Sequence, residues 1–236
     1  GKSDATCRDT NMSLPHVGVG GTAANTERFF ASGNERTRMH TTGHGAYGYR
    51  LNPEDQVHLL VELMNTSTTA REVYVTVEYA YVPGDTPGYR DVEPVWLDAA
   101  QCGTSEVPPK TGRYAISSPV WTSTFAGTLV GGGGHLHDGG TNLTFERNGQ
   151  QFCDSVASYA PAPASGEMGG GHEHGGHDDH ATSEHISTMS LCAPGERLEV
   201  GDTLQIHGHY DDAAHPHMVH DGKLHTIMAI GVLYYA

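Results

Sequence analysis

Short segments with alternating side chains constrain the fold of this chain more than any other feature. In them β-branched and aromatic residues alternate with polar ones, a period typical of half-buried β-strands. They span residues 57–64, 72–82, 124–132, 141–147, 203–209 and 226–235. No helical crossover of the length that a parallel sheet requires separates them, so we expect antiparallel pairing. We predict an all-β chain, folded as an antiparallel, jelly-roll-like β-sandwich that is either one large sandwich or two packed ones.

Composition agrees with this fold class and argues against some partners. The chain has 236 residues, of which 31 are glycine and 36% are hydrophobic, enough for a buried core in a loop-rich protein. Its 28 acidic and 13 basic side chains give a formal net charge of -15. Such a charge repels phosphate backbones and anionic membrane surfaces, so we predict no nucleic-acid partner and no membrane partner.

The four cysteines indicate an oxidising compartment. Cys7, Cys102, Cys153 and Cys192 are an even number without a Cys-x-x-Cys spacing, which favours two disulfides over a thiolate metal site. Four cysteines allow three connectivities, and the sequence does not select one. If Cys153 pairs with Cys192, the remaining pair is Cys7 with Cys102.

Other features also favour secretion. Asn11, Asn65 and Asn142 each begin an Asn-x-Ser/Thr tripeptide, which is compatible with glycosylation. The chain begins at Gly1 rather than at a methionine, and it contains no apolar run of about 18 residues. We expect that a signal peptide has been removed, that no segment spans a membrane, and that the protein is secreted.

One segment is too polar to form part of a core. Residues 161–190 consist mainly of small and polar residues, with five histidines scattered among glycine, glutamate and aspartate. We predict a long histidine-rich loop inserted between two strands. A disulfide between Cys153 and Cys192 would close the base of this loop. We expect residues 1–91 to form an N-terminal β-region packed on a second domain, 92–236, that contains the loop.

The sharpest motif is His135-Leu136-His137, which follows four glycines and precedes Asp138. Residues two apart in a strand project from the same face, so the two imidazoles can converge on one metal while Leu136 faces the other side. Neutral imidazole suits copper and zinc. We expect the glycines to keep a coordination position open and Asp138 to accept a proton from a coordinated ring. The alternative is that both histidines face solvent.

The C-terminal segment offers a third ligand. Met228, Ile230, Val232 and Tyr234 share one face of the expected strand. A thioether at the start of that face suits copper, which accepts a soft sulfur ligand that zinc rarely uses. The alternative for Met228 is ordinary packing in the core.

These motifs resemble those of known copper proteins. Two segments are similar to the stress-up-regulated nodulin family. They are Gly-His-Leu-His-Asp-Gly-Gly at 134–140, and His225-Thr226 with the strand expected after it. The chain also resembles the C-terminal copper domain of peptidylglycine α-hydroxylating monooxygenase. This resemblance lies in the order of several segments along the sequence: 125–130, the His-x-His pair, Asn-Gly-Gln at 148–150, 200–204, Met228 and the paired tyrosines 234–235. The resemblance covers roughly residues 92–236 and extends only loosely to 1–91.

The resemblance implies a jelly-roll-like sandwich that holds copper between His135, His137 and Met228, with His225 as a substitute for Met228. The monooxygenase also has an upstream copper site with adjacent histidines, whereas this chain has no His-His pair. We therefore do not expect two-copper hydroxylation of peptidylglycine. The implied function is that of a copper-dependent monooxygenase or oxidase acting on an extracellular small molecule, peptide or polymer.

Two other functions compete with this one. The histidine-rich loop favours a non-catalytic protein that buffers or sequesters copper. Trp96 and Trp121 would favour a carbohydrate-binding or adhesion module if they were exposed, although a core position is typical for each. His207 and His209 continue a predicted strand, and the histidines at 215–220 are interpreted as part of a solvated polar turn.

Overall fold

The computed structural model describes residues 4–7, 26–35, 37–41, 46–59, 61, 63, 69–161, 184–220 and 222–236. The strands are β1 Tyr47–Gly48, β2 Arg90–Asp91, β3 Glu93–Asp98, β4 Arg113–Ser117, β5 Trp121–Thr122, β6 Gly127–Leu136, β7 Gly140–Arg147, β8 Gln150–Pro161, β9 Glu184–Met189, β10 Arg197–Leu198, β11 Thr203–Asp211, β12 Val219–His220, β13 Lys223–Leu224 and β14 Ala229–Tyr235. The described residues contain no helix, and hence none that is long and apolar enough to cross a membrane. The predicted all-β class is confirmed.

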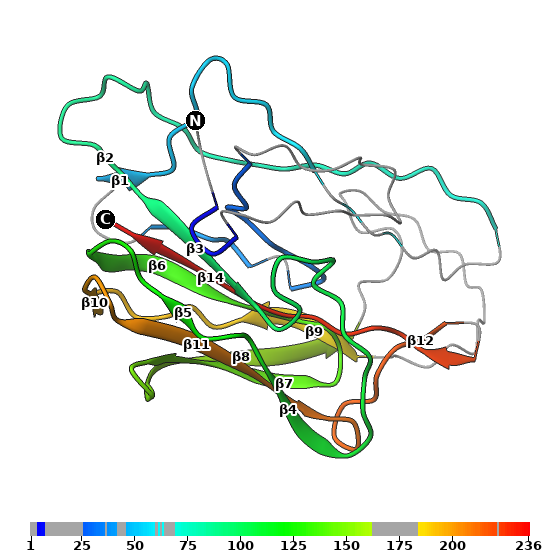
Figure 1. Ribbon diagram of the computed structural model, residues 1–236. Coiled ribbons are helices and arrows are strands. Elements are labelled where there is room, and N and C mark those ends of the chain that lie inside the picture. The colour runs from blue at the N-terminus through cyan, green and yellow to red at the C-terminus, as the bar shows by residue number, and fades with distance from the viewer. Residues whose placement is uncertain are drawn as a thin grey trace.

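Two antiparallel sheets pack face to face (Figure 1). One has the strand order β10-β6-β14-β3, and the other has the order β4-β11-β7-β8-β9, with β5 also paired to β11. In the first of these sheets β14 lies between β6 and β3, so segments far apart in the sequence pair with each other. The predicted antiparallel sandwich is therefore confirmed, and the small β1–β2 pair is parallel.

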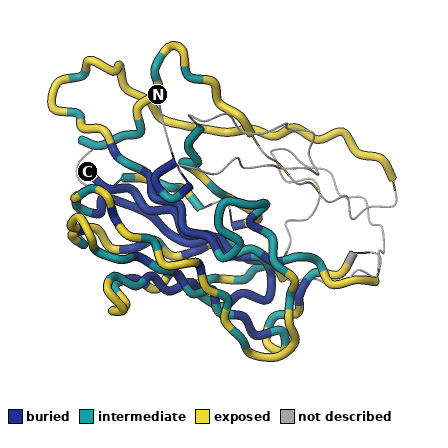
Figure 2. Tube along the Cα trace, in the orientation of Figure 1, coloured by how far each residue is buried: buried dark blue, intermediate teal, exposed yellow. Residues whose placement is uncertain are grey.

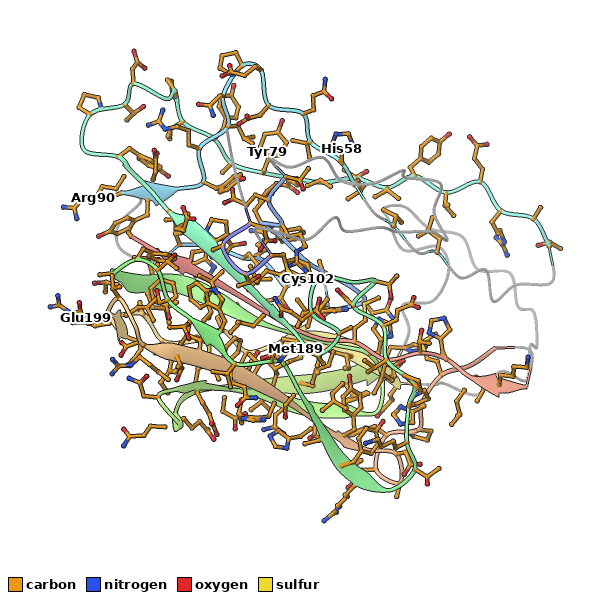
Figure 3. All side chains as sticks on the ribbon, viewed as in Figure 1. His58, Tyr79, Arg90, Cys102, Met189 and Glu199 are labelled. Carbon is orange, nitrogen blue, oxygen red and sulfur yellow. A yellow bond between two sulfur atoms is a disulfide. The ribbon has the colours of Figure 1, made fainter. Side chains whose placement is uncertain are left out.

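The core lies between the two sheets, as the buried tubes in Figure 2 show. Leu136 from β6 and Phe145 from β7 are almost completely buried there, and Met189 of β9 also belongs to it (Figure 3). Gly231 of β14 makes room for Phe145, since a Cβ at that glycine would lie 2.5 Å from the Cε1 atom of the ring. Alternation along each strand thus sends one set of side chains inward.

The outer face of the four-stranded sheet carries a second apolar cluster. Its buried members include Trp96, Val130 and Val232. Residues of the N-terminal segment pack against it, among them Ala31, Met39, Tyr47 and Tyr49. The Tyr234 hydroxyl donates a hydrogen bond of 2.6 Å to the carbonyl of Phe29. The N-terminal segment therefore covers the outer face of this sheet, while the division of the chain at residue 91 stays a prediction.

Two disulfides join Cys7 to Cys102 and Cys153 to Cys192, which is one of the three connectivities that the sequence allows. The first ties the N-terminal segment to the chain after β3. The second links β8 to the chain that follows β9. Because β9 begins at Glu184, the histidine-rich loop is shorter at its end than the predicted 161–190. Residues 162–183 lie outside the described part of the chain.

The strand prediction for 72–82 is wrong, because this segment forms no strand in the described structure. Its alternating apolar side chains are exposed, and Tyr79 is 72% exposed. No strand is assigned in the described residues of 57–64 either. Figure 3 shows His58 and Tyr79 on extended chain beyond the two packed sheets. Alternation shows that a segment suits a strand, but a strand also needs a neighbour at the right register.

The three glycosylation sequons remain predictions. Asn11 and Asn65 lie outside the described residues. Asn142 lies within β7, between β11 and β8, and its side-chain amide donates a hydrogen bond of 2.7 Å to Asp154.

Candidate metal centre

The predicted His-x-His pair lies at the end of β6. His135 is the penultimate residue of that strand, and His137 follows its last residue, Leu136. Leu136 is 2% exposed and belongs to the core between the sheets, so the imidazoles project toward the outer face. The ring centroids of His135 and His137 lie 5.5 Å apart, with the ring planes at 83°. The strand geometry therefore places the two rings side by side, as the spacing predicts.

Glu35 contacts the first of these histidines. Its Oε1 atom lies 2.6 Å from Nδ1 of His135, and both residues are buried, with exposed fractions of 4% and 8%. Gly33 lets the chain pass close to the ring, because a Cβ at that position would lie 2.6 Å from Cε1 of His135. Glu35 was not predicted from the sequence, because it lies 100 positions before His135 and no motif includes both residues.

The ionisation of Glu35 depends on this contact. Burial by itself would raise the pKa of the carboxyl group, but the charge and hydrogen bond of His135 lower it. Hydrogen bonds from the backbone of Glu35 and Gly33 lower it further, and the net result is a pKa below the ordinary value. A carboxylate only accepts hydrogen bonds, so Nδ1 of His135 is the donor.

The second ring is held in a similar way. Nδ1 of His137 lies 2.8 Å from the carbonyl oxygen of Thr226. A carbonyl oxygen also only accepts, so Nδ1 of His137 carries a proton. In a neutral imidazole the other nitrogen, Nε2, is then the atom with a lone pair. Both rings are therefore held through their Nδ1 atoms.

Met228 lies across from this pair. Ala229 is paired with Leu136 and Ile230 with His135, so extending the register by one residue sets Met228 opposite His137. Directly opposite residues of an antiparallel pair project from the same face. Met228 is half-buried and packs against the outer-face cluster. The register thus brings the three predicted ligands to one face of the sheet.

His225 also lies near His137, and the two ring centroids are 6.0 Å apart. Its Nδ1 atom lies 3.1 Å from the same Thr226 carbonyl oxygen that His137 contacts. A small hollow of about 10 Å³ opens here. It is lined by His137, Asp138, Met218, His225, Thr226 and Ile227.

Asp138 interacts with other parts of the chain. Its carboxylate accepts hydrogen bonds from Nδ1 of His185 at 2.5 Å and from the backbone N–H of Ile186 at 3.0 Å. Its carbonyl oxygen accepts a hydrogen bond of 2.9 Å from Nδ1 of His217. These contacts hold the turn after His137 in place, while Glu35 and the Thr226 carbonyl contact the rings of the pair.

The glycines before the pair do not serve the expected purpose. Gly131 to Gly134 are buried, and a Cβ at Gly131 would lie 2.6 Å from the carbonyl oxygen of His40. A Cβ at Gly134 would lie 3.0 Å from Cβ of Leu143 on the other side of the sheet. The glycines therefore allow close packing of chain on both faces of β6, rather than leaving the backbone open.

The histidines of β11 and of the turn before β12 lie at other places in the fold. His207 and His209 are on β11 in the other sheet, whereas His217 is buried next to Asp138. Within the part of the chain that the structure describes, no group of three or more His, Cys, Asp or Glu side chains is arranged to hold a metal ion. The ligand set His135, His137 and Met228 therefore stays a prediction.

Comparison with known proteins gives two similar sequences. A protein of Phoma sp. named "Probable copper-dependent oxygenase M1" is 29% identical over 213 residues, covering 88% of this chain and 51% of that protein. A protein of Cochliobolus lunatus named "Probable copper-dependent oxygenase clz3" is 27% identical over 212 residues, covering 88% of this chain and 64% of that protein. This chain is a distant relative of proteins named copper-dependent oxygenases.

The relationship extends over most of the chain, but the chain spans only about half to two thirds of the length of these relatives. No protein-family model and no solved structure matches it. The resemblance to the stress-up-regulated nodulin family therefore stays a prediction.

Proposed function

We propose that this protein is a copper-dependent oxygenase or oxidase that binds one copper ion through His135, His137 and Met228. The observation that supports the proposal is the β6–β14 register, in which Ala229 pairs with Leu136. Extended by one residue, this register would put the Met228 thioether opposite His137. The relationship to two proteins named copper-dependent oxygenases supports it independently.

The donor set fits copper. Two imidazoles and one thioether suit both Cu(I) and Cu(II), whereas zinc rarely uses a thioether. The Nδ1 atoms of His135 and His137 are engaged with Glu35 and with the Thr226 carbonyl, so Nε2 of each ring would bind the ion. Copper bound there would supply one-electron chemistry with oxygen.

The residues around the pair have separate tasks. Glu35 orients His135 and stabilises the proton on its Nδ1 atom. The N-terminal segment covers the face near His135 and keeps water away from that ring, which is 8% exposed. His137 is only half-buried and borders the hollow. A substrate would therefore approach from the side of His137.

The substrate class follows from the protein's expected location. The two disulfides are typical of proteins in an oxidising compartment, and we propose that the protein is secreted. Its substrate would then be an extracellular small molecule, peptide or polymer.

Copper titration of the purified protein tests the binding site. We expect one tight equivalent by electron paramagnetic resonance in the wild type and in His209→Ala, a matched control from the His-x-His motif of β11. His137→Ala should lose tight binding. Met228→Leu should weaken binding of Cu(I), measured by competition with a Cu(I) chelator, more than binding of Cu(II), because sulfur favours the softer ion.

Oxygen consumption with a reductant tests the chemistry. The copper-loaded wild type should consume oxygen faster than His137→Ala under the same conditions. Tight binding without any excess oxygen consumption would contradict an oxidase or oxygenase and favour copper sequestration. Weak binding at several places that survives His137→Ala would contradict the site itself.

A further inference from the structure

A small hairpin places a second thioether near the candidate centre. Strands β12 and β13 pair Val219 with Leu224. At the base of this hairpin the backbone N–H of His225 donates a hydrogen bond of 2.8 Å to the carbonyl of Met218. Extending the register by one residue makes Met218 and His225 directly opposite, and such residues project from the same side of the hairpin.

Both residues border the hollow beside His137. Met218 and His225 line it together with His137, whose ring centroid lies 6.0 Å from that of His225. Its volume of about 10 Å³ is near that of a single water-sized group. Two histidines and a methionine therefore border a space suited to one small ligand, and Asp138, Thr226 and Ile227 complete its lining.

We propose that Met218 and His225 form, with His137, a loading site that receives Cu(I) and passes it to the centre at His135, His137 and Met228. This inference rests on the function proposed above. It assigns Met218 a role in capturing copper and makes His225 a transient ligand rather than a substitute for Met228.

The chemistry of the donors identifies the ion. Thioether sulfur is a soft ligand that selects Cu(I) over harder divalent ions, and imidazole accepts either oxidation state of copper. The transfer needs no electron, because copper stays Cu(I) while coordination bonds to Met218 and His225 are exchanged for bonds to His135 and Met228.

Sharing of His137 makes the loading site transient. The Nδ1 atom of this ring is engaged with the Thr226 carbonyl, so only Nε2 would bind copper. One nitrogen lone pair serves one ion, and the two ligand sets therefore cannot both be filled through His137. An ion held by His137 can instead exchange its other ligands from one side of the ring to the other.

The position of the hairpin agrees with this order of events. Figure 1 shows β12 projecting beyond one end of the two sheets, at the end where β14 begins. Met218 and His225 are half-buried, whereas His135 is buried beneath the N-terminal segment. An ion arriving from solvent therefore meets the hairpin donors before it meets His135.

Stopped-flow transfer of Cu(I) from a coloured Cu(I) chelator to the metal-free protein tests the proposal. We expect Met218→Leu and His225→Gln each to slow loading by about tenfold, which corresponds to about 1.4 kcal/mol. The final copper stoichiometry and affinity, and the spectrum after oxidation to Cu(II), should match those of the wild type. Met39→Leu removes a thioether that packs on the outer-face cluster, and it should load at the wild-type rate.

Wild-type loading rates in both hairpin variants would overturn the proposal and leave the copper centre intact. Loss of equilibrium Cu(I) affinity in Met218→Leu would also overturn it, because Met218 would then be a permanent ligand. A wild-type protein without tight copper would instead overturn the function proposed above, and the loading site with it. Circular dichroism of each variant confirms that it is folded.

Discussion

Two of the four His-x-His motifs in the sequence lie back to back across the same core. His135 and His137 flank Leu136 at the end of β6, and His207 and His209 flank Gly208 in β11. The middle residues face each other, since a Cβ on Gly208 would lie 3.2 Å from Cδ2 of Leu136. Each motif thus sends its imidazoles to an outer face of the sandwich, on opposite sides.

The surroundings of the two motifs differ. Nδ1 of His207 lies 2.6 Å from the Ser117 hydroxyl, and its Nε2 lies 3.4 Å from the Glu146 carboxylate. Nε2 of His209 lies 3.2 Å from the Thr144 hydroxyl. These partners engage the Nε2 atoms, whereas the contacts of Glu35 and Thr226 are with the Nδ1 atoms of His135 and His137.

The residues across the ladder differ as well. His209 is paired with Ala115 and Asn142, neither of which carries a soft donor. The β6–β14 register, extended by one residue, puts Met228 opposite His137. The comparison teaches that His-x-His spacing supplies two rings on one face, while the neighbouring strands decide whether those rings suit a metal.

Truncating the residue beneath both motifs should have the largest effect on stability. Leu136→Ala removes a side chain that is 2% exposed, and we expect it to lower the free energy of unfolding by about 2–5 kcal/mol. Urea denaturation measures this change. Val156→Ala, at a residue that is 47% exposed, should change stability by roughly 0.5 kcal/mol or less. Equal losses of stability in Leu136→Ala and Val156→Ala would show that packing of Leu136 between the two motifs contributes little to stability.

Overpacking the second motif should have a somewhat smaller effect. A methyl group on Gly208 would lie 2.6 Å from Cβ of Ala229, which cannot move aside as a flexible side chain can. We expect Gly208→Ala to cost about 1–3 kcal/mol of stability. The double variant Gly208→Ala with Ala229→Gly should recover part of that loss in the same denaturation experiment. No loss in the single variant would contradict the back-to-back packing.

Removing a carboxylate should distinguish the two motifs in their affinity for copper. Glu35→Gln weakens the hydrogen bond that Nδ1 of His135 donates, because it replaces a carboxylate acceptor with a neutral amide. We expect copper affinity to fall by about 10–100-fold. Competition with a copper chelator measures it. The matched variant Glu146→Gln, beside His207, should leave tight copper binding unchanged. A greater loss in Glu146→Gln than in Glu35→Gln would reverse the assignment of the two motifs.

Much of the fold could be predicted from the sequence. β7, β11 and most of β14 coincide with alternating segments. Buried and half-buried residues alternate along most of β11, whereas every residue of β14 is buried, because the N-terminal segment covers its outer face. β8 and β9 were not predicted, since their polar residues obscure the alternation. The segment 72–82 shows the opposite error, because its pattern is clear although the described structure assigns it no strand.

The candidate site was only partly predictable. The pairing of His135 with His137 on one face follows from strand geometry, and Met228 was inferred from the face it shares and from a resemblance. Glu35 could not be found, because no local pattern links an isolated glutamate to a histidine 100 residues later. Met218 was missed for a similar reason, since a two-residue hairpin brings it to His225.

The sequence by itself determined the fold class, the possible disulfides and the two rings that share a face, because these depend on local periodicity and residue chemistry. Only the tertiary structure decided which His-x-His motif has a buried carboxylate on Nδ1 and sulfur donors nearby. That choice depends on the β6–β14 register and on an N-terminal segment packed across β6. Both are long-range contacts, and the free energy of burial that selects them is shared among residues distant in the chain.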